Sequence, residues 1–466
     1  MAKKKTTISI EERLQQALVP KEEQPYEVPG NWVWSYTDNM VNIFRGVSYN
    51  KNEAHTVPKI SDCLILRGGN ITEGDLVLDT DDNVYVDSSI VNSEQYIRKY
   101  DVIIVSSTGS TKVIGRAGIS KATYDKVAFG AFLTLVRPRN WINKRYLDLF
   151  FLSDLYRNRI QKLASGVNIN NIRIGYILES PIPLPPLPEQ QRIVSHIENL
   201  FPKLDEAKEK LQEVIDGFET RKAAILHKAF TGELTKKWRE EHGVRMDSWK
   251  DFELKKISKI GSGGTPSRKI PDYFNGTISW IKTGEINWNV IRNSEESISG
   301  DAIDNSSAKV YPKGTVVVAM YGQGLTRGRA AILGIEAATN QAVCALQPNE
   351  FVNNYYLFYY FMEHYWDYRQ KAFGGNQPNY SATMIASWII NLPSLNEQEE
   401  IVRIIESLLT KEQAAKDTAE QTLEQIDLIQ KSILARAFRG ELGTNDPNEP
   451  SSIELLRQAI ADNQNS

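Results

Sequence analysis

An internal duplication constrains this sequence most strongly. Residues 189–234 and 397–442 align without a gap at an offset of 208, and 17 of the 46 positions are identical. Both segments begin with Glu-Gln and end in AF-x-GEL. Upstream, GRAGI at 115–119 matches GRAAI at 328–332 at a slightly different offset, as loops of unequal length would produce. Matches that keep their order over so long a span predict two copies of one structural unit.

Each copy ends in a segment with the apolar spacing of a coiled coil. Apolar or small residues recur in steps of four and three along 193–229, and a similar stripe follows 401–437. This pattern predicts a long amphipathic helix in each copy. Pro202 predicts a kink or restart of the first helix, and Gly232 and Gly440 predict the two ends. The helices either pack on each other in antiparallel fashion or bury their stripes in two separate cores.

The segments ahead of these helices are typical of mixed α/β modules. Short apolar runs predict strands and longer periodic segments predict helices; the strands are 64–66, 102–105, 132–136, 315–319 and 342–346, and the helices are 143–163 and 353–372. We expect a mixed α/β fold with two α/β modules separated by two long helices packed as an antiparallel coiled coil, with pseudo-twofold symmetry. The expected boundaries are an N-terminal arm at 1–28, a first module at 29–187, a central helix and connector at 188–243, a second module at 244–394, a distal helix at 395–442 and a C-terminal tail at 443–466.

Charge is unevenly distributed along the chain. The formal net charge is −3, but residues 30–182 carry 18 basic and 15 acidic side chains, and residues 248–395 carry 14 and 12. The mildly basic modules permit local phosphate contacts. Two cysteines are too few for a disulfide framework, and the longest nearly apolar stretch has ten residues, whereas a membrane helix needs about 20. We therefore expect a cytoplasmic protein that does not enter a membrane.

Motifs for catalysis are missing from the sequence. The five histidines are scattered, and no glycine-rich loop has the spacing of an ATP-binding or dinucleotide-binding motif. Pro271-Asp272 lacks the downstream Glu-x-Lys that a nuclease would need, and no Asn-Pro-Pro-aromatic run could hold a flipped adenine. These features predict a non-catalytic chain with no metal and no cofactor of its own.

Polar loops in both modules interleave basic and aromatic residues. Arg suits guanine edges, Asn and Gln suit adenine, and hydroxyl groups suit phosphates or bases. Each loop could equally be an ordinary connection, but similar loops recur at parallel places in both copies. The predicted DNA contacts are Arg45, Ser48, Tyr49, Lys51, Arg67, Asn70, Ser107, Ser110, Lys112, Asn168, Asn170, Asn171, Thr265, Ser267, Arg268, Lys269, Lys282, Thr283, Tyr321, Gln323, Arg327, Asn376, Gln377, Asn379 and Tyr380.

Taken in order, these motifs resemble those of the DNA-specificity (S) subunits of type I restriction-modification systems, over essentially the whole chain. The resemblance lies in PLPEQQRIV at 186–194, its partner SLNEQEEIV at 394–402, the two AF-x-GEL ends, SGGTPSR at 262–268 and PYEVPGNW at 25–32. It implies two target-recognition domains that each read one half of a split, asymmetric DNA site. The second exit is less proline-rich than the first, because Ser394 and Asn396 replace Pro186 and Pro188, which leaves its geometry open.

The resemblance also implies partners. Double-stranded DNA, two methylation (M) subunits and restriction (R) subunits would bind the chain, and the partner subunits would bring S-adenosylmethionine, ATP and magnesium. The residues implied in subunit docking are Glu189, Gln190, Ile193, Val194, Phe230, Glu397, Gln398, Ile401, Val402 and Phe438. The similar segments Ser9–Leu18 and Ser452–Ile460 are expected to pack near one another.

Two other functions fit parts of the pattern. A coiled-coil scaffold would bind no DNA, even beside a methylation partner. An independent DNA enzyme such as a nuclease would cleave DNA alone in the presence of a divalent metal.

Overall fold

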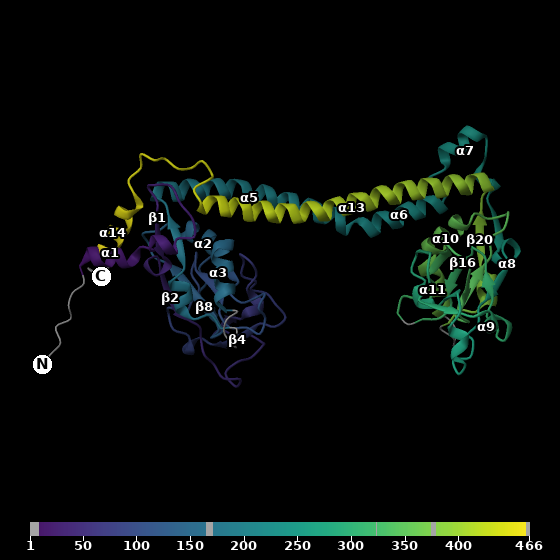
Figure 1. Cartoon of the computed structure of the whole chain (residues 1–466), viewed down its shortest axis with the longest axis horizontal. Helices are drawn as coiled ribbons and strands as arrows, with labels where there is room; N and C mark the ends of the chain where they lie inside the picture. Colours follow the sequence, from purple (N-terminus) through teal and green to yellow (C-terminus); the bar gives the residue numbers. More distant parts are fainter. Residues whose placement is uncertain (1–8, 165–170, 323, 374–378, 463–466) are drawn as a thin grey trace. The chain divides into compact units, whose positions relative to one another are not determined.

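The computed structural model describes residues 9–164, 171–322, 324–373 and 379–462. The chain divides into two compact units: residues 1–209 with 422–466, and residues 210–421. Each unit contains one α/β module (Figure 1). The long helices α5 (Leu187–Asp216) and α13 (Leu395–Phe438) contribute residues to both units.

The first module stacks helices on one sheet and that sheet on a second one. The sheet orders are β2-β8-β5-β6 and β4-β3-β7. Ile104 and Val136 point toward the helices, whereas Ile103 and Leu135 pack with Phe129 of the second sheet. The elements are β2 (Val41–Arg45), β3 (Asp62–Leu66), β4 (Val84–Asp87), β5 (Val102–Val105), β6 (Ala117–Ile119), β7 (Val127–Phe129), β8 (Leu133–Pro138), α2 (Lys144–Leu152), α3 (Asp154–Ala164) and α4 (Ile174–Leu178).

The second module repeats this architecture. Its sheets have the orders β11-β19-β16-β17-β13 and β14-β12-β18-β15. Val316 and Val318 pack in the helical core, and Val317 and Ala319 pack in the core between the sheets. The elements are β11 (Ile260–Ser262), β12 (Ile278–Ile281), β13 (Val290–Ile291), β14 (Glu296–Ile298), α9 (Gly300–Asp304), β15 (Val310–Tyr311), β16 (Val316–Ala319), β17 (Ala330–Leu333), β18 (Ala337–Thr339), β19 (Val343–Leu346), α10 (Asn354–Glu363), α11 (Tyr365–Phe373) and α12 (Ala382–Ala386).

The strand order confirms the duplication. The run β8-β5-β6 in the first module corresponds to β19-β16-β17 in the second, antiparallel throughout. The predicted strands are confirmed to within two residues at either end. The two predicted module helices are each interrupted, at Ser153 and at His364, where a polar residue separates two shorter helices.

A two-stranded ribbon leads from each module into its long helix. In the first module β1 (Val33–Tyr36) pairs with β9 (Pro181–Leu184) just ahead of α5. In the second, β10 (Lys250–Glu253), which precedes the short α8 (Leu254–Ile257), pairs with β20 (Ile389–Leu392) ahead of α13. The ribbon positions the start of each long helix against its own module.

The long helices pack side by side with opposite chain directions. In the first unit, Gln430 donates to Asp205 at 2.9 Å and Lys208 pairs with Asp427 at 2.5 Å. In the second unit, α6 (Phe218–Phe230) also packs antiparallel to α13, and Arg221 pairs with Glu412 at 2.6 Å. Of the kink or restart predicted at Pro202, the restart is wrong: α5 continues through that proline, and the break between α5 and α6 lies at Gly217. Gly232 and Gly440 follow the helix ends with positive φ, as predicted.

Both ends of the described chain meet on the first module. Helix α1 (Ile10–Ala17) packs against α14 (Ser452–Asp462), with Arg457 placed 3.3 Å from Glu11. Leu456 of α14 is fully buried, and the backbone of Ser452 donates to Asn31. The expected packing of these two similar segments is confirmed.

Candidate nucleic-acid interface

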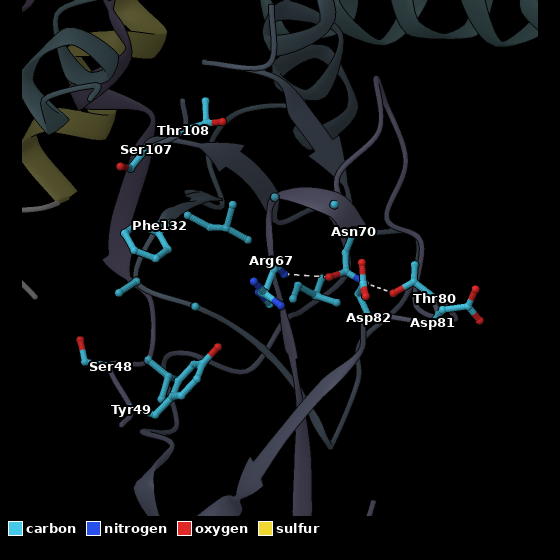
Figure 2. A pocket seen from close by; sticks show the side chains of 17 residues that line it. Ser48, Tyr49, Arg67, Asn70, Thr80, Asp81, Asp82, Ser107, Thr108 and Phe132 are labelled. Atoms are coloured by element: carbon cyan, nitrogen blue, oxygen red, sulfur yellow. Dashed lines mark hydrogen bonds between the residues drawn. The ribbon is translucent and has the colours of Figure 1, made fainter. Parts of the chain in front are cut away.

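A cavity of about 740 Å³ opens in the first module where β2, β3 and β5 end (Figure 2). The loop that precedes β8 borders it as well. Five segments that are separate in sequence, 47–49, 66–70, 80–82, 107–108 and 130–133, therefore meet at one place. The polar and aromatic residues that line it are Ser48, Tyr49, Arg67, Asn70, Thr80, Asp81, Asp82, Ser107, Thr108 and Phe132.

Five predicted DNA contacts of the first module line this cavity: Ser48, Tyr49, Arg67, Asn70 and Ser107.

The close approach of two loops requires glycine, because a Cβ on Gly46 would collide with the carbonyl oxygen of Gly130. Gly263 meets Thr339 in the same way in the second module. The duplicated modules therefore bring corresponding loops together by the same backbone contact.

Asn70 shapes the cavity wall from within. Its side chain is buried, donates to the Val77 carbonyl at 2.9 Å and to Asn83 Oδ1 at 3.1 Å, and accepts from the backbone N–H of Arg67 at 2.8 Å. These bonds occupy the amide that was predicted to read adenine. Asn70 therefore fixes the loop that carries Arg67.

The other predicted contacts of the first module lie outside the cavity lining. Arg45, Lys51, Ser110, Lys112 and Asn171 are exposed, and Asn171 forms a β-bridge with Ser107. Asn168 and Asn170 lie outside the described residues. Exposed basic side chains around a cavity are compatible with phosphate contacts.

Predicted contacts of the second module surround the ends of β11, β12 and β16. Thr265, Ser267, Arg268, Lys269 and Asn379 are exposed, Lys282 and Thr283 are half-buried, and 41% of Tyr321 is exposed. Gln323, Asn376 and Gln377 lie outside the described residues. The strand ends match those of the first module, so the two copies present corresponding loops.

Two cations of the second module share one carboxylate. Arg268 pairs with Glu296 at 2.7 Å, and Lys282 pairs with Glu296 at 3.0 Å and with Glu295 at 2.9 Å. Hydrogen bonds to the two glutamates raise the pKa of Lys282, and hydrogen bonds from Arg268 and Lys282 lower the pKa of Glu296. The guanidinium of Arg268 also lies 4.1 Å from the ring centre of Phe274. Internal pairing therefore reduces what these cations can offer a phosphate.

Arg327 and Tyr380 are interior residues. Arg327 is 6% exposed and Tyr380 1% exposed, and the guanidinium lies 5.4 Å from the ring centre. Burial raises the pKa of the Tyr380 hydroxyl. Their predicted role as direct DNA contacts would require this part of the module to open.

The Glu of each Glu-Gln motif anchors a helix to its module. Glu189 accepts from Trp32 Nε1 at 2.7 Å and from Thr444. Glu397 accepts from Trp249 Nε1 at 3.1 Å, Thr235 at 2.8 Å and Arg239 at 2.7 Å, all buried. The clusters match, except that the buried arginine occurs only in the second. Burial raises the pKa of Glu189, and the hydrogen bonds from Trp32 and Thr444 partly oppose that rise.

The Gln of each motif closes a second duplicated joint. Gln190 accepts from the backbone N–H of Asn143, which caps α2, and donates to the carbonyl of Pro185. Gln398 accepts from Asn353, which caps α10, and donates to the carbonyl of Pro393. The segments that lead into α5 and α13 therefore have the same hydrogen bonds, although the second contains fewer prolines.

The remaining predicted docking residues lie mostly in the modules' own cores. Ile193, Val194, Ile401, Val402 and Phe438 are buried, and Phe230 is half-buried. Phe438 packs on Tyr146 and Phe150, and Phe230 packs on Tyr356 and Tyr360. These contacts explain the AF-x-GEL repeat as the attachment of each helix end to a module.

Sequence reasoning missed several cavity residues. Phe132 is 70% exposed at the cavity, and Asp81, Asp82, Thr80 and Thr108 line it. The apolar pattern predicts a strand that begins at Phe132, but β8 begins at Leu133. The place of Phe132 next to Gly130 and Ala131 was the available signal for a loop.

Among the described residues, no helix is both long enough and apolar enough to span a membrane.

Known proteins share this sequence pattern. A family model described as type I restriction modification DNA specificity domain matches residues 29–216 and 246–425. The chain is 27% identical to the type I restriction enzyme StySPI specificity subunit of Salmonella potsdam, covering 89% of this chain and 90% of the relative. It is also 27% identical to the EcoKI specificity subunit of Escherichia coli (strain K12), with the same coverage.

Solved structures share the fold. The HsdS subunit from Thermoanaerobacter tengcongensis superimposes with a TM-score of 0.62 and 19% identity, over 90% of this chain and 100% of that chain. A chain from a study of complex assembly and conformational transition of the type I R-M system gives a TM-score of 0.66 at 19% identity, with the same coverage.

Proposed function

Because the chain belongs to the type I restriction modification DNA specificity family, we propose that each of its two modules reads one half of a split, asymmetric DNA site. The chain is a non-catalytic specificity subunit, and methylation and cleavage belong to its partner subunits. The observation that carries the proposal is the repeated architecture, in which each module gathers polar loops at corresponding strand ends.

The readers proposed are residues 29–187 and 244–394, with the arm, helices and tail as the frame that holds them. In the first reader, the proposed contacts fall into two groups, one outside the cavity and one that lines it. Arg45, Lys51 and Lys112 would contact phosphates, since they lie on the surface outside the cavity. Arg67 and Tyr49 would reach bases from the cavity.

In the second reader, the exposed residues Thr265, Ser267, Lys269, Tyr321 and Asn379 supply the proposed contacts. Arg268 and Lys282 would contribute after exchanging Glu296 for DNA, at an energetic cost set by their existing pairs.

The partners proposed are double-stranded DNA, two methylation subunits and the restriction subunits, in the cytoplasm. S-adenosylmethionine would enter with the methylation subunits, and ATP and magnesium with the restriction subunits. The helix segments that begin at Glu189 and Glu397 and end at Phe230 and Phe438 would form the docking core. Within it, the buried side chains would set the position of the surface that a partner touches.

Expression of the chain with its methylation subunit in a host without adenine methylation tests this function. Single-molecule sequencing should then find one methylated motif of two short specific sequences separated by an unspecified spacer. The motif should vanish when this chain is omitted. A methylation subunit that produces the same motif alone would contradict the proposal, and so would a soluble, co-purified pair that methylates no motif.

A further inference from the structure

The cavity of the first module combines opposite charges that do not pair with each other. We propose that this cavity reads the edges of a guanine–cytosine base pair in the major groove, with Arg67 donating to guanine and one carboxylate of the Asp81–Asp82 pair accepting from cytosine. The inference rests on the function proposed above and specifies which bases one reader recognises.

Arg67 is positioned to donate outward. It follows β3, its side chain is exposed, and it forms no ion pair with any residue in the part of the chain that the structure describes. Its backbone N–H is held by Asn70, which is itself locked to Asn83. The root of the side chain is therefore fixed while the guanidinium stays available. A fork of this kind matches the O6 and N7 acceptors of guanine.

The carboxylates select the kind of ligand. Asp81 and Asp82 line the same cavity, and neither forms an ion pair with Arg67. A phosphate entering here would be repelled by two carboxylates, whereas the edge of a guanine–cytosine pair offers acceptors to Arg67 and an amino donor to an aspartate. The charge arrangement therefore favours a base edge over the DNA backbone.

Aromatic groups complete the lining. In the view of Figure 2, Arg67 lies between Phe132 and Tyr49 on one side and the two carboxylates on the other. Phe132 keeps 70% of its surface exposed, although its carbonyl oxygen is held by the backbone N–H groups of Ser106 and Ser107. An exposed ring on an anchored loop supplies apolar contact to a base.

The second module gives a contrast within the same chain. Its basic residues at the corresponding strand ends, Arg268 and Lys282, are both occupied by Glu296. Loops at matching positions thus carry different charge patterns in the two copies. This difference is what an asymmetric site requires, because two identical readers would select two identical half-sites.

Motif mapping of charge variants tests the inference. The chain would be expressed with its methylation subunit, and sequencing would compare wild type with Arg67→Ala, Arg67→Lys and the double variant Asp81→Asn/Asp82→Asn. The matched control is Arg98→Ala, an exposed arginine that precedes β5, whereas the cavity lies beyond the end of that strand. Arg67 is exposed, so its variants should unfold at the wild-type midpoint.

We expect Arg67→Ala to make one guanine–cytosine position degenerate in one half of the motif. The preference for that pair should fall by about 10–100-fold. Arg67→Lys should not restore it, because lysine lacks the planar fork. The aspartate variant should relax the same pair, and Arg98→Ala should leave the motif unchanged.

Other results separate this inference from the function beneath it. An unchanged motif in Arg67→Ala would overturn the inference alone. A uniform loss of methylation that Arg67→Lys restores would overturn it too, since that pattern indicates a phosphate contact. A wild-type chain that directs no motif would overturn the proposed function and the inference with it.

Discussion

Glu397→Ala should lower the free energy of unfolding of the second unit by about 3–5 kcal/mol. Glu397 is fully buried and accepts from Arg239, Thr235 and Trp249. Alanine would leave Arg239, whose side chain is only 10% exposed, without its carboxylate partner in the interior. Denaturant unfolding of the full chain measures the loss, and hydrogen exchange over residues 235–261 locates it.

Glu399→Ala is the matched control for that variant. It removes the same side chain two positions later on α13, from an exposed site. Its effect should stay within about 0.5 kcal/mol. Equal unfolding midpoints for the two variants would contradict the role of the Glu397 cluster in fastening the second module to its helix.

Phe438→Ala should cost the first unit about 3–5 kcal/mol. The Phe438 ring is 1% exposed, and its centre lies 5.2 Å from that of Tyr146 and 5.9 Å from that of Phe150. Removing it opens a cavity where α13 ends on α2. Thermal or denaturant unfolding reports the loss, and faster hydrogen exchange in residues 144–152 should accompany it.

Leu428→Ala provides the comparison on the same helix. Leu428 is 65% exposed, so its truncation should change stability by less than about 0.5 kcal/mol. If Phe438→Ala kept wild-type stability but lost the methylation subunit, the ring would be a direct docking contact. A loss of stability, with partner binding kept below the unfolding midpoint, would identify it as a core residue.

Much of the fold could be predicted because the duplication repeats its own signals. The strands at 102–105 and 316–319 are continuous apolar runs, which buried strands require when both faces pack. The helix breaks at Ser153 and His364 were missed because the apolar pattern continues past them. Gly217, and not Pro202, interrupts the first long helix. Proline is the stronger helix breaker of the two, so the sequence pointed to the wrong residue.

The candidate site was only partly predictable. Alternating polar and basic residues marked the loops of Ser48, Arg67 and Ser107, but nothing in the sequence showed that they meet at one cavity. In the sequence, Asn70 looks the same as an asparagine whose amide reads a base. Only its hydrogen bonds to Val77 and Asn83 show that this amide stabilises the loop.

Repetition at the Glu-Gln motif was attributed to partner docking. Within this chain, Glu189 and Glu397 also form hydrogen bonds with Trp32 and Trp249. Residues that make a contact within each copy recur in the duplicated sequence just as residues that contact a partner would. Sequence repetition alone therefore could not separate the two explanations.

The most direct test of two independent readers is an exchange of one module. Residues 29–187 would be replaced by the corresponding module of a relative, and the methylated motif would be mapped beside that of the wild-type chain. One half of the motif should change to the donor's sequence while the other half stays the same. A change in both halves, or in neither, would contradict the assignment of one half-site to each module.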